Sequence, residues 1–257
     1  MGQRYEVDAA LTPMVRHIRW VTAEQAARAE RYVRLPDGES ELLLRVGADG
    51  NDLTATVVGS RTMPLQKGPT QPVTTLLVRF RVAGAYPFFG VPMHELTDRL
   101  VPVGNLWPRA LVSSLAGTAT PRHAAAALSR ALRTRLAGPA RYEPHAAPYV
   151  RRALRVATAA PRLPTVRELA AMLGGSERHL RRAFAEVVGI APKPMLRIVR
   201  FQRALGWARE LAHVDWSAVA QRAGYCDQAH LIDDFRELGG RTPTALVEGP
   251  RVRRRAR

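Results

Sequence analysis

The sequence predicts an α+β protein in which a mainly antiparallel β half precedes an all-α half. Runs rich in Leu, Val and Thr, punctuated by Gly and Pro, fill residues 1–115 and are typical of short strands joined by turns. Over residues 147–248, apolar side chains instead recur at helical spacing between short turns. Residues 116–146 combine a helical run with a linker that contains Pro and Gly. The change of pattern predicts two domains.

Three runs predict the strands of the first domain. ELLLRV (41–46) and LTATVV (53–58) flank GADGND, whose Asp-Gly step is typical of a hairpin turn. VTTLLVRFRV (73–82) is rich in β-branched residues and forms a third candidate. The strands are therefore expected to be antiparallel and closely connected.

A helix is predicted over residues 121–137, because Pro121 follows the capping residue Thr120 and an Ala/Leu/Arg-rich run comes next. At the end of the chain, RVRRRAR lies within residues 249–257 and is expected to be a solvated basic tail that attracts phosphate.

Charge is the strongest feature of the composition. The formal net charge is +17, and Arg supplies nearly all of the cations, since Lys67 and Lys193 are the only lysines. A surface this basic favours a polyanionic partner, because each phosphate neutralised releases condensed counterions. A merely Arg-rich protein without such a partner remains an alternative.

The sequence also argues against several classes of protein. It contains no run of 18 apolar residues, and MGQRYEVDAALTPMVRHIRW carries acids where a signal peptide needs an apolar core. A single cysteine, Cys226, forms no internal disulfide or thiolate zinc cluster and is expected in a turn. We therefore expect a cytoplasmic protein without a membrane span.

The segment 165–189, TVRELAAMLGGSERHLRRAFAEVVG, predicts a first helix–turn–helix unit. Thr165 and Glu168 have capping-box spacing, and an apolar stripe follows at Leu169, Met172 and Leu173. Gly174 and Gly175 permit a tight turn. The small Ala170, four residues before Gly174, lets the two helices approach closely.

Ser176 is expected to cap the second helix of this unit, whose inner stripe is Leu180, Phe184 and Val187. Periodicity then places Arg178 and Arg182 on the opposite side and Arg181 on the flank. Arg can bond guanine O6 and N7 together or clamp a phosphate. A solvated basic helix face is the alternative, but the capped turn favours entry of helix 176–188 into a major groove.

The segment 215–240 predicts a second unit with a turn one residue longer. Ala220 and Gly224 again stand four apart, and Asp227 takes the capping place. Leu231, Phe235 and Leu238 form the inner stripe. The outward positions include Ala229, Asp233 and Arg236, with Gln228 and His230 near the start of the helix.

Residues 191–211 predict one long connecting helix. Its inner positions are Leu196, Val199, Leu205 and Ala208, and its arginines Arg197, Arg200 and Arg203 are expected outside. Such a spacer would hold two reading helices so that they address successive major grooves, roughly 34 Å apart.

Residues 147 to 247 resemble the DNA-binding domain of the AraC/XylS family of bacterial transcription regulators. The motifs are G-Y-x-D-Q-x-H-L-x-x-x-F from Gly224 to Phe235, G-x-T-P from Gly240 to Pro243, and VGIAPKPMLRIVRFQRAL. The resemblance implies firm base contacts by the first reading helix and mainly phosphate anchoring by the second. Asp233 stands where some members carry a base-reading basic residue. With Asp234 beside it, we expect the second helix to touch DNA through its N-terminal end.

The first half resembles an uncharacterised cupin-like domain found fused to this DNA-binding domain, over LPDGESELLLRVG, VVGSRTMP and VRFRVAGAYPFFGVPMHELTDRLVPVGNLW. The resemblance implies a small antiparallel barrel, over about residues 1–115, that senses something or mediates self-association. It implies no known ligand.

An enzymatic first half is the less favoured alternative. Metal-dependent cupins need clustered ligands, whereas the candidate histidines are scattered at His17, His94, His123 and His145. The sequence has no Walker-type phosphate loop and no nucleophile elbow. The aromatic residues of this half are expected mainly in the core: Tyr86, Phe88, Phe89 and Trp107. DNA-repair relatives of the helical domain use several reactive cysteines, which this chain lacks.

We therefore predict a sequence-specific DNA-binding transcription regulator with no catalytic residues, metal or cofactor. The expected partners are double-stranded DNA, RNA polymerase, a small-molecule effector of unknown site and a second copy of the chain. A metal-dependent cupin enzyme and a non-specific architectural protein are the alternatives. The predicted DNA contacts are Ser176, Arg178, Arg181, Arg182, Arg197, Arg200, Asp227, Gln228, His230 and Arg236.

Overall fold

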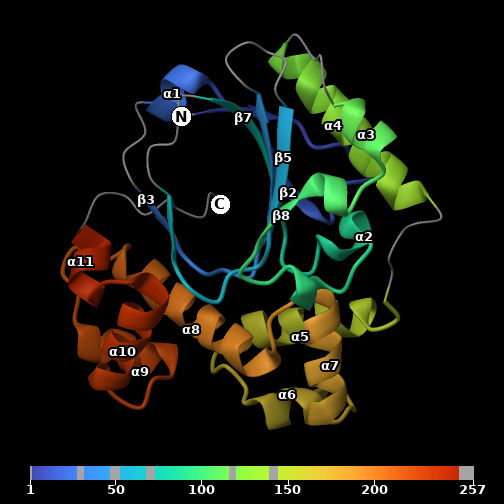
Figure 1. The fold of residues 1–257 in the computed structure, drawn as a ribbon. Helices are drawn as coiled ribbons and strands as arrows, with labels where there is room; N and C mark the ends of the chain where they lie inside the picture. The colour runs from blue at the N-terminus through green and yellow to red at the C-terminus, as the bar shows by residue number, and fades with distance from the viewer. Residues whose placement is uncertain are drawn as a thin grey trace.

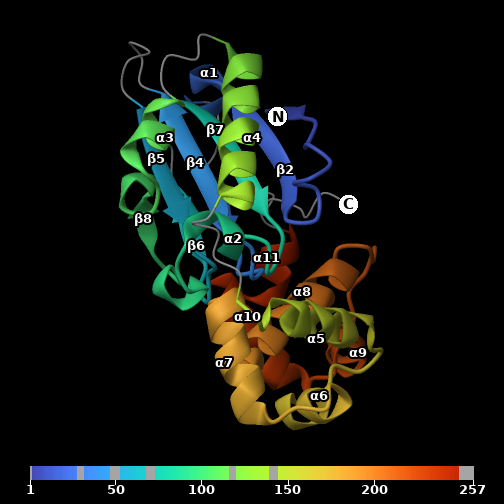
Figure 2. The ribbon, with the colours of Figure 1, turned by 90° about the vertical axis from the view of Figure 1, so that its right-hand side faces the viewer.

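A computed structural model describes residues 2–27, 32–46, 53–67, 73–115, 120–138 and 144–248. An antiparallel β-sheet and its covering helices form the β part (residues 2–138), and the helical part (residues 144–248) lies against one end of it (Figures 1 and 2). None of the helices in these ranges is long and apolar enough to cross a membrane. The expected basic tail, residues 249–257, lies outside the described residues.

The β part contains a six-stranded sheet in which every neighbouring pair is antiparallel. Its order is β1 (Gln3–Tyr5), β2 (Val15–Val21), β7 (Thr74–Phe80), β4 (Glu41–Val46), β5 (Leu53–Val58) and β8 (Leu100–Pro102). Two further strands, β3 (Tyr32–Arg34) and β6 (Leu65–Lys67), pair separately. The expected antiparallel β architecture is confirmed. Among the described strands, β1 and β8 remain edges, so hydrogen bonding does not close a ring.

Two of the predicted strands match β4 and β5 at both ends, and the third is shortened to β7 at its two ends. The turn between β4 and β5, where the Asp-Gly step was noted, lies outside the described residues. In the register of the sheet, Leu43 stands opposite Leu77 on one side and Thr56 on the other.

One face of the sheet packs into the main core. Alternate residues of β4 and β7, among them Leu42, Leu44, Val78 and Phe80, point to that face and are buried. It is covered by α2 (Tyr86–Phe89) and α4 (Pro121–Ala137) (Figure 2). The helix expected over 121–137 is α4, capped by Thr120 as predicted.

Aromatic side chains fill the space under these helices. Phe80 lies 5.2 Å from Phe88 and 5.5 Å from Phe89, between ring centroids. Trp107 donates its indole N–H to the carbonyl of Phe88 at 2.8 Å, and Tyr86 is buried as well. These four aromatic side chains are therefore part of the core, as predicted. The remaining short elements of the β part are α1 (Ala23–Ala27), η1 (Met93–Glu95), η2 (Val103–Asn105) and α3 (Arg109–Ser113).

The helical part contains the two predicted units and the predicted spacer. Its helices are α5 (Ala147–Ala159), α6 (Val166–Met172), α7 (Glu177–Val187), α8 (Pro192–Ala208), α9 (Trp216–Ala223), α10 (Gln228–Gly239) and α11 (Pro243–Glu248). The first unit is α6, its turn and α7; the second is α9, its turn and α10. The spacer is α8, which joins them (Figure 1).

The inner face of α8 is rotated from the expected one. Met195, Ile198 and Phe201 are buried, as are the expected Leu205 and Ala208. Leu196 and Val199 are only partly buried, because the stripe begins one residue earlier and continues at three-residue steps.

The β part touches the turn that joins α7 to α8. Gly189 in that turn has φ +85°, and a Cβ there would stand 2.6 Å from the backbone oxygen of Met93 and 2.4 Å from Oγ1 of Thr97. Glycine is required here for two reasons: the left-handed backbone and the close approach of η1.

Gly189→Ala is expected to lower the free energy of unfolding by about 1–3 kcal/mol, because it adds left-handed strain and a collision with the backbone of η1. Chemical denaturation measures this. The matched control is Gly206→Ala, at an exposed position of α8 with nothing within 4 Å of the new Cβ. That variant is expected to gain up to about 1 kcal/mol, as Ala does over Gly in a helix. Equal stability of the two variants would contradict the packing described.

Candidate nucleic-acid interface

Local hydrogen bonds define the first unit. The Thr165 side chain accepts from the backbone of Glu168, whose carboxylate accepts from the Thr165 N–H at 2.7 Å, so the predicted capping box is present. These hydrogen bonds hold the pKa of Glu168 below its usual value, with the Thr165 backbone N–H as the largest cause. Gly174 has φ +68°, and Ser176 caps α7 by accepting from the N–H of His179 at 3.2 Å. The turn thus fixes where α7 begins.

One face of α7 is buried and the other is open. Leu180, Phe184 and Val187 are at most 1 % exposed, as the periodicity predicted. Arg178, Arg181 and Arg182 are all exposed. In α6, by contrast, the expected inner stripe is wrong at Met172, whose side chain is 57 % exposed because α6 buries Leu169 and Ala170 against α7.

The three arginines differ in their local partners. Arg181 donates to Glu177, one turn earlier, at 2.8 Å, and both side chains are exposed. Such a pair contributes little to stability and can exchange for another anion. Arg178 and Arg182 have no hydrogen bond or ion pair with any described residue. Their guanidinium groups are therefore available to a ligand.

A contact that the sequence reasoning missed supports the start of α7. The ring of Tyr149, from α5, lies 4.8 Å from that of His179, and a Cβ on Gly175 would stand 2.5 Å from the Tyr149 hydroxyl. Partial burial raises the pKa of Tyr149. The second glycine of the Gly-Gly pair was the available signal, since Gly174 alone supplies the left-handed turn. Gly175 leaves room for the tyrosine.

The second unit begins α10 in the predicted way. Gly224 has φ +80°, and the carboxylate of Asp227 accepts from the N–H of His230 at 2.8 Å. Gln228 is exposed and accepts from the hydroxyl of Ser217 at 2.9 Å. His230 is only partly exposed, since its ring lies against Tyr225. The open part of this unit is thus the first turn of α10.

Asp233 and Asp234 have opposite environments. The side chain of Asp233 is 75 % exposed, and its Oδ1 lies 3.9 Å from Nη1 of Arg236, which is exposed as well. Asp234 is buried, accepts from Nε of Arg197 at 2.5 Å and lies 3.4 Å from Nη2 of Arg200. Arg197 and Arg200 were expected outside, but their side chains are only 31 % and 21 % exposed. Both arginines neutralise an acid of α10 instead.

The packing of α10 across α8 explains this pairing. The rings of Phe201 and Phe235 lie 4.9 Å apart, which brings Asp234 beside the arginines of α8. Arg197 also binds both carboxylate oxygens of Glu237, and these hydrogen bonds, with those to Asp234, raise its pKa. The guanidinium of Arg200 lies 4.3 Å from the centroid of Tyr225.

Arg203, the third arginine expected outside, is also engaged. Its Nη2 donates to the carbonyl oxygens of Ala157 and Thr158 at 3.1 and 2.6 Å. These oxygens belong to the end of α5, so Arg203 ties α8 to the first half of the helical part. Across the described residues, no group of three or more His, Cys, Asp or Glu is placed to hold a metal ion.

Two family models match the chain. One, described as a helix-turn-helix domain, covers residues 169–249, and the other, described as a domain of unknown function (DUF6597), covers residues 3–102. The first begins within α6 and spans the rest of both units and the spacer, and the second spans all strands of the six-stranded sheet. No curated protein matches the chain.

The chain is also similar to solved structures. A transcriptional regulator with an AraC-type DNA-binding domain from Chromobacterium violaceum is 20% identical, with a TM-score of 0.37, over 40% of this chain and 95% of that one. A probable AraC family regulator from Rhodopseudomonas palustris is 26% identical, with a TM-score of 0.35, over 38% and 94%. ToxT from Vibrio cholerae is 6% identical, with a TM-score of 0.44, over 90% and 96%.

Asp234→Asn is expected to lower the free energy of unfolding by about 2–3 kcal/mol, because two arginines lose the charge of their shared buried partner. The neighbouring Asp233→Asn is the matched control and is expected to change stability by less than about 0.5 kcal/mol. Urea denaturation of both variants distinguishes the two environments. Similar losses in the two variants would contradict the buried ion pairs of Asp234 with Arg197 and Arg200.

Proposed function

We propose that this chain is a DNA-binding transcription regulator of the AraC/XylS type, and that α7 of its helix-turn-helix domain supplies most of the sequence readout. The observation that carries the proposal is the exposed row of Arg178, Arg181 and Arg182 on a helix whose opposite face is buried. A helix fits the major groove, and Arg reads guanine there through two parallel hydrogen bonds. Ser176, at the cap, would lie near the phosphates.

The second unit has an anchoring role in this proposal. The first turn of α10 presents Gln228, His230 and backbone N–H groups at the positive end of the helix dipole, which favours a phosphate. Asp227 fixes that turn through its own cap, and Arg236 adds a charge farther along. Asp233 limits base readout at the middle of α10, because it would meet the anionic groove.

Arg197 and Arg200 take no part in the proposed contact. Both are committed to Asp234, and removing them would disturb the domain before it disturbed the complex. The charge that draws the chain to DNA comes instead from its exposed arginines, within a formal net charge of +17.

We further propose that the β part modulates DNA binding or contact with RNA polymerase, by a population shift that a small-molecule effector or a second copy of the chain could bias. No catalytic role is proposed for it. Competition with random DNA tests the architectural alternative, since specific binding exceeds non-specific binding by about a thousandfold or more. Selection of bound sites from random DNA, with and without cell extract, reports sequence preference and effector dependence together.

Arg182→Ala is expected to cost about 1–3 kcal/mol at one base pair of the selected site and to relax selectivity there. Arg236→Ala is the matched control, an exposed arginine of the second unit. It is expected to weaken all sequences alike and to reduce the slope of log affinity against log salt by about one. Binding titrations on the selected site, its single-base variants and random DNA separate the two effects. If both variants behave alike, the division between reading and anchoring fails.

A further inference from the structure

The helical part rests on the β part at three places, and the first is the turn between α7 and α8. The buried hydroxyl of Ser60 donates to the carbonyl of Val188 at 2.9 Å, and the hydroxyl of Thr97 donates to that of Gly189 at 2.8 Å. These two carbonyls follow directly after the helix that carries the exposed arginines. The end of α7 is therefore held by side chains of the other domain.

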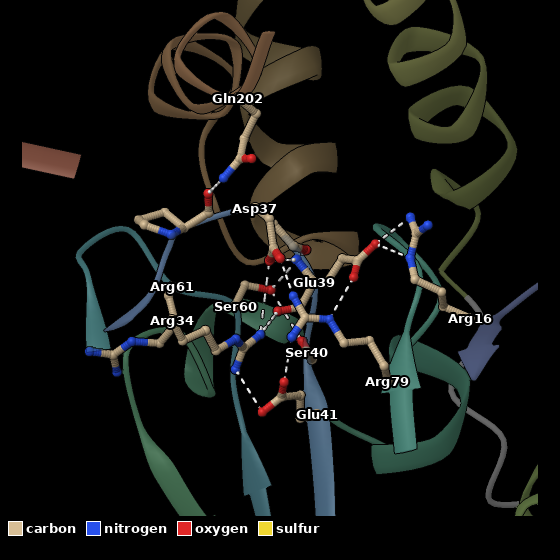
Figure 3. Close-up of polar contacts among 12 residues, drawn as sticks. Arg16, Arg34, Asp37, Glu39, Ser40, Glu41, Ser60, Arg61, Arg79 and Gln202 are labelled. Atoms are coloured by element: carbon tan, nitrogen blue, oxygen red, sulfur yellow. Dashed lines mark hydrogen bonds and ion pairs between the residues drawn. The ribbon is translucent and has the colours of Figure 1, made fainter. Parts of the chain in front are cut away.

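The second place is α8 itself. The amide of Gln202 donates to the carbonyl of Pro36 at 2.6 Å (Figure 3). Nearby, a Cβ on Gly38, which has φ +74°, would stand 2.8 Å from the terminal methyl of Met195. Residues 35–40 form a loop, which we call the docking loop, that fits closely against the spacer helix.

The third place lies at the end of the second unit. Gly240, which follows α10, sits next to Pro64 of the β part, at ordinary van der Waals range for a Cβ built on the glycine. The β part thus touches the first unit, the spacer and the second unit. Three separated contacts determine how the helical part is oriented on the β part. Because they lie at the end of α7, on α8 and after α10, they also hold α7 and α10 in one relative position.

A buried network of acids and arginines stiffens the docking loop (Figure 3). Arg79, from β7, donates to Asp37 and Glu41 and to Oε2 of Glu39, the last at 2.7 Å. Glu39 is 1 % exposed. Burial raises the pKa of Asp37, although Arg79 and Arg34 act in the opposite direction. The loop cannot shift without separating charges that are largely shielded from water.

Two more arginines connect this network to other strands. Arg34, at the end of β3, donates to the backbone carbonyl of Glu39 at 2.5 Å and lies 3.3 Å from Glu41. Arg16, in β2, donates to the carboxylate of Glu39 at 2.5 Å. The loop that touches α8 is therefore bonded to β2, β3, β4 and β7, so a displacement of these strands would reach the spacer helix.

The docking does not cover the reading face. Arg178, Arg181 and Arg182 remain exposed in the full chain, so the β part does not block α7 sterically. The β part instead contacts the turn after α7, the spacer α8 and Gly240 after α10.

We propose that the β part is a brace that sets the separation of the two reading helices, and that Ser60, Thr97 and Gln202 are positioning residues for the spacing between the two halves of the DNA site. The docking loop is the route by which a change in the sheet alters that spacing. The inference rests on the proposed function, since it assumes that both units meet DNA together.

The test uses the full chain with Thr97→Val and Gln202→Leu combined, which removes one hydrogen bond to the turn and one to the docking loop. The probe is DNA selected by the unaltered protein from a random pool. It is compared with versions in which the DNA between the two half-sites is longer or shorter by a few base pairs. The unaltered protein is expected to lose about tenfold in affinity when the length of DNA between the half-sites changes. The double variant is expected to lose less than about threefold.

The matched control is Thr62→Val, which removes a hydroxyl that binds Asp98 within the β part. It should lose as much affinity as the unaltered protein when that length changes, and Thr97→Ser with Gln202 intact should do the same, because the hydroxyl is retained. If the double variant loses as much affinity as the unaltered protein when the DNA between the half-sites changes in length, the proposed brace is wrong.

Hydrogen exchange separates this inference from the proposed function. The double variant is expected to exchange faster at residues 188–190 and along α8, whereas the Thr62→Val control is not. If the unaltered protein selects no sequence, the proposed function fails, and exchange still reports on the brace. Unchanged exchange at these amides in the double variant would overturn it independently of DNA.

Discussion

The helical part depends on the pairing of α8 with α10, in which Asp234 is held between Arg197 and Arg200 beside two phenylalanine rings that meet edge to face. A buried carboxylate requires a partner, so the two helices have one crossing that satisfies it. On its other sides α8 contacts α5 through Arg203 and the β part through Gln202. Both helix–turn–helix units are therefore positioned by one helix, and its arginines Arg197, Arg200 and Arg203 bind groups within the protein.

Elements controlled by local interactions were predictable from the sequence. The capping box at Thr165, the caps at Ser176 and Asp227, and the hairpin strands β4 and β5 depend on residues within a few positions of one another. Helical periodicity also placed the arginines of α7 correctly, because one strongly apolar stripe fixes the opposite face.

Features controlled by contacts between distant segments were not predictable. The exposure of Met172, the rotation of α8 and the pairing of Arg197 with Asp234 depend on which helices pack against each other. One signal was present in the spacing, since Arg197 and Arg200 stand three apart, as do Asp234 and Glu237. Matching steps of opposite charge on two helices favour pairing, but only once the helices are known to be neighbours.

The docking loop and the first residue of β4 carry three acids, Asp37, Glu39 and Glu41, against three arginines, and all six side chains are largely withdrawn from water. Mobile ions screen exposed charges well and enclosed ones poorly. Salt that weakens binding of exposed arginines to DNA would therefore leave the ion pairs under the docking loop nearly unchanged. The β part and the helical part would then keep their relative position when the protein leaves DNA.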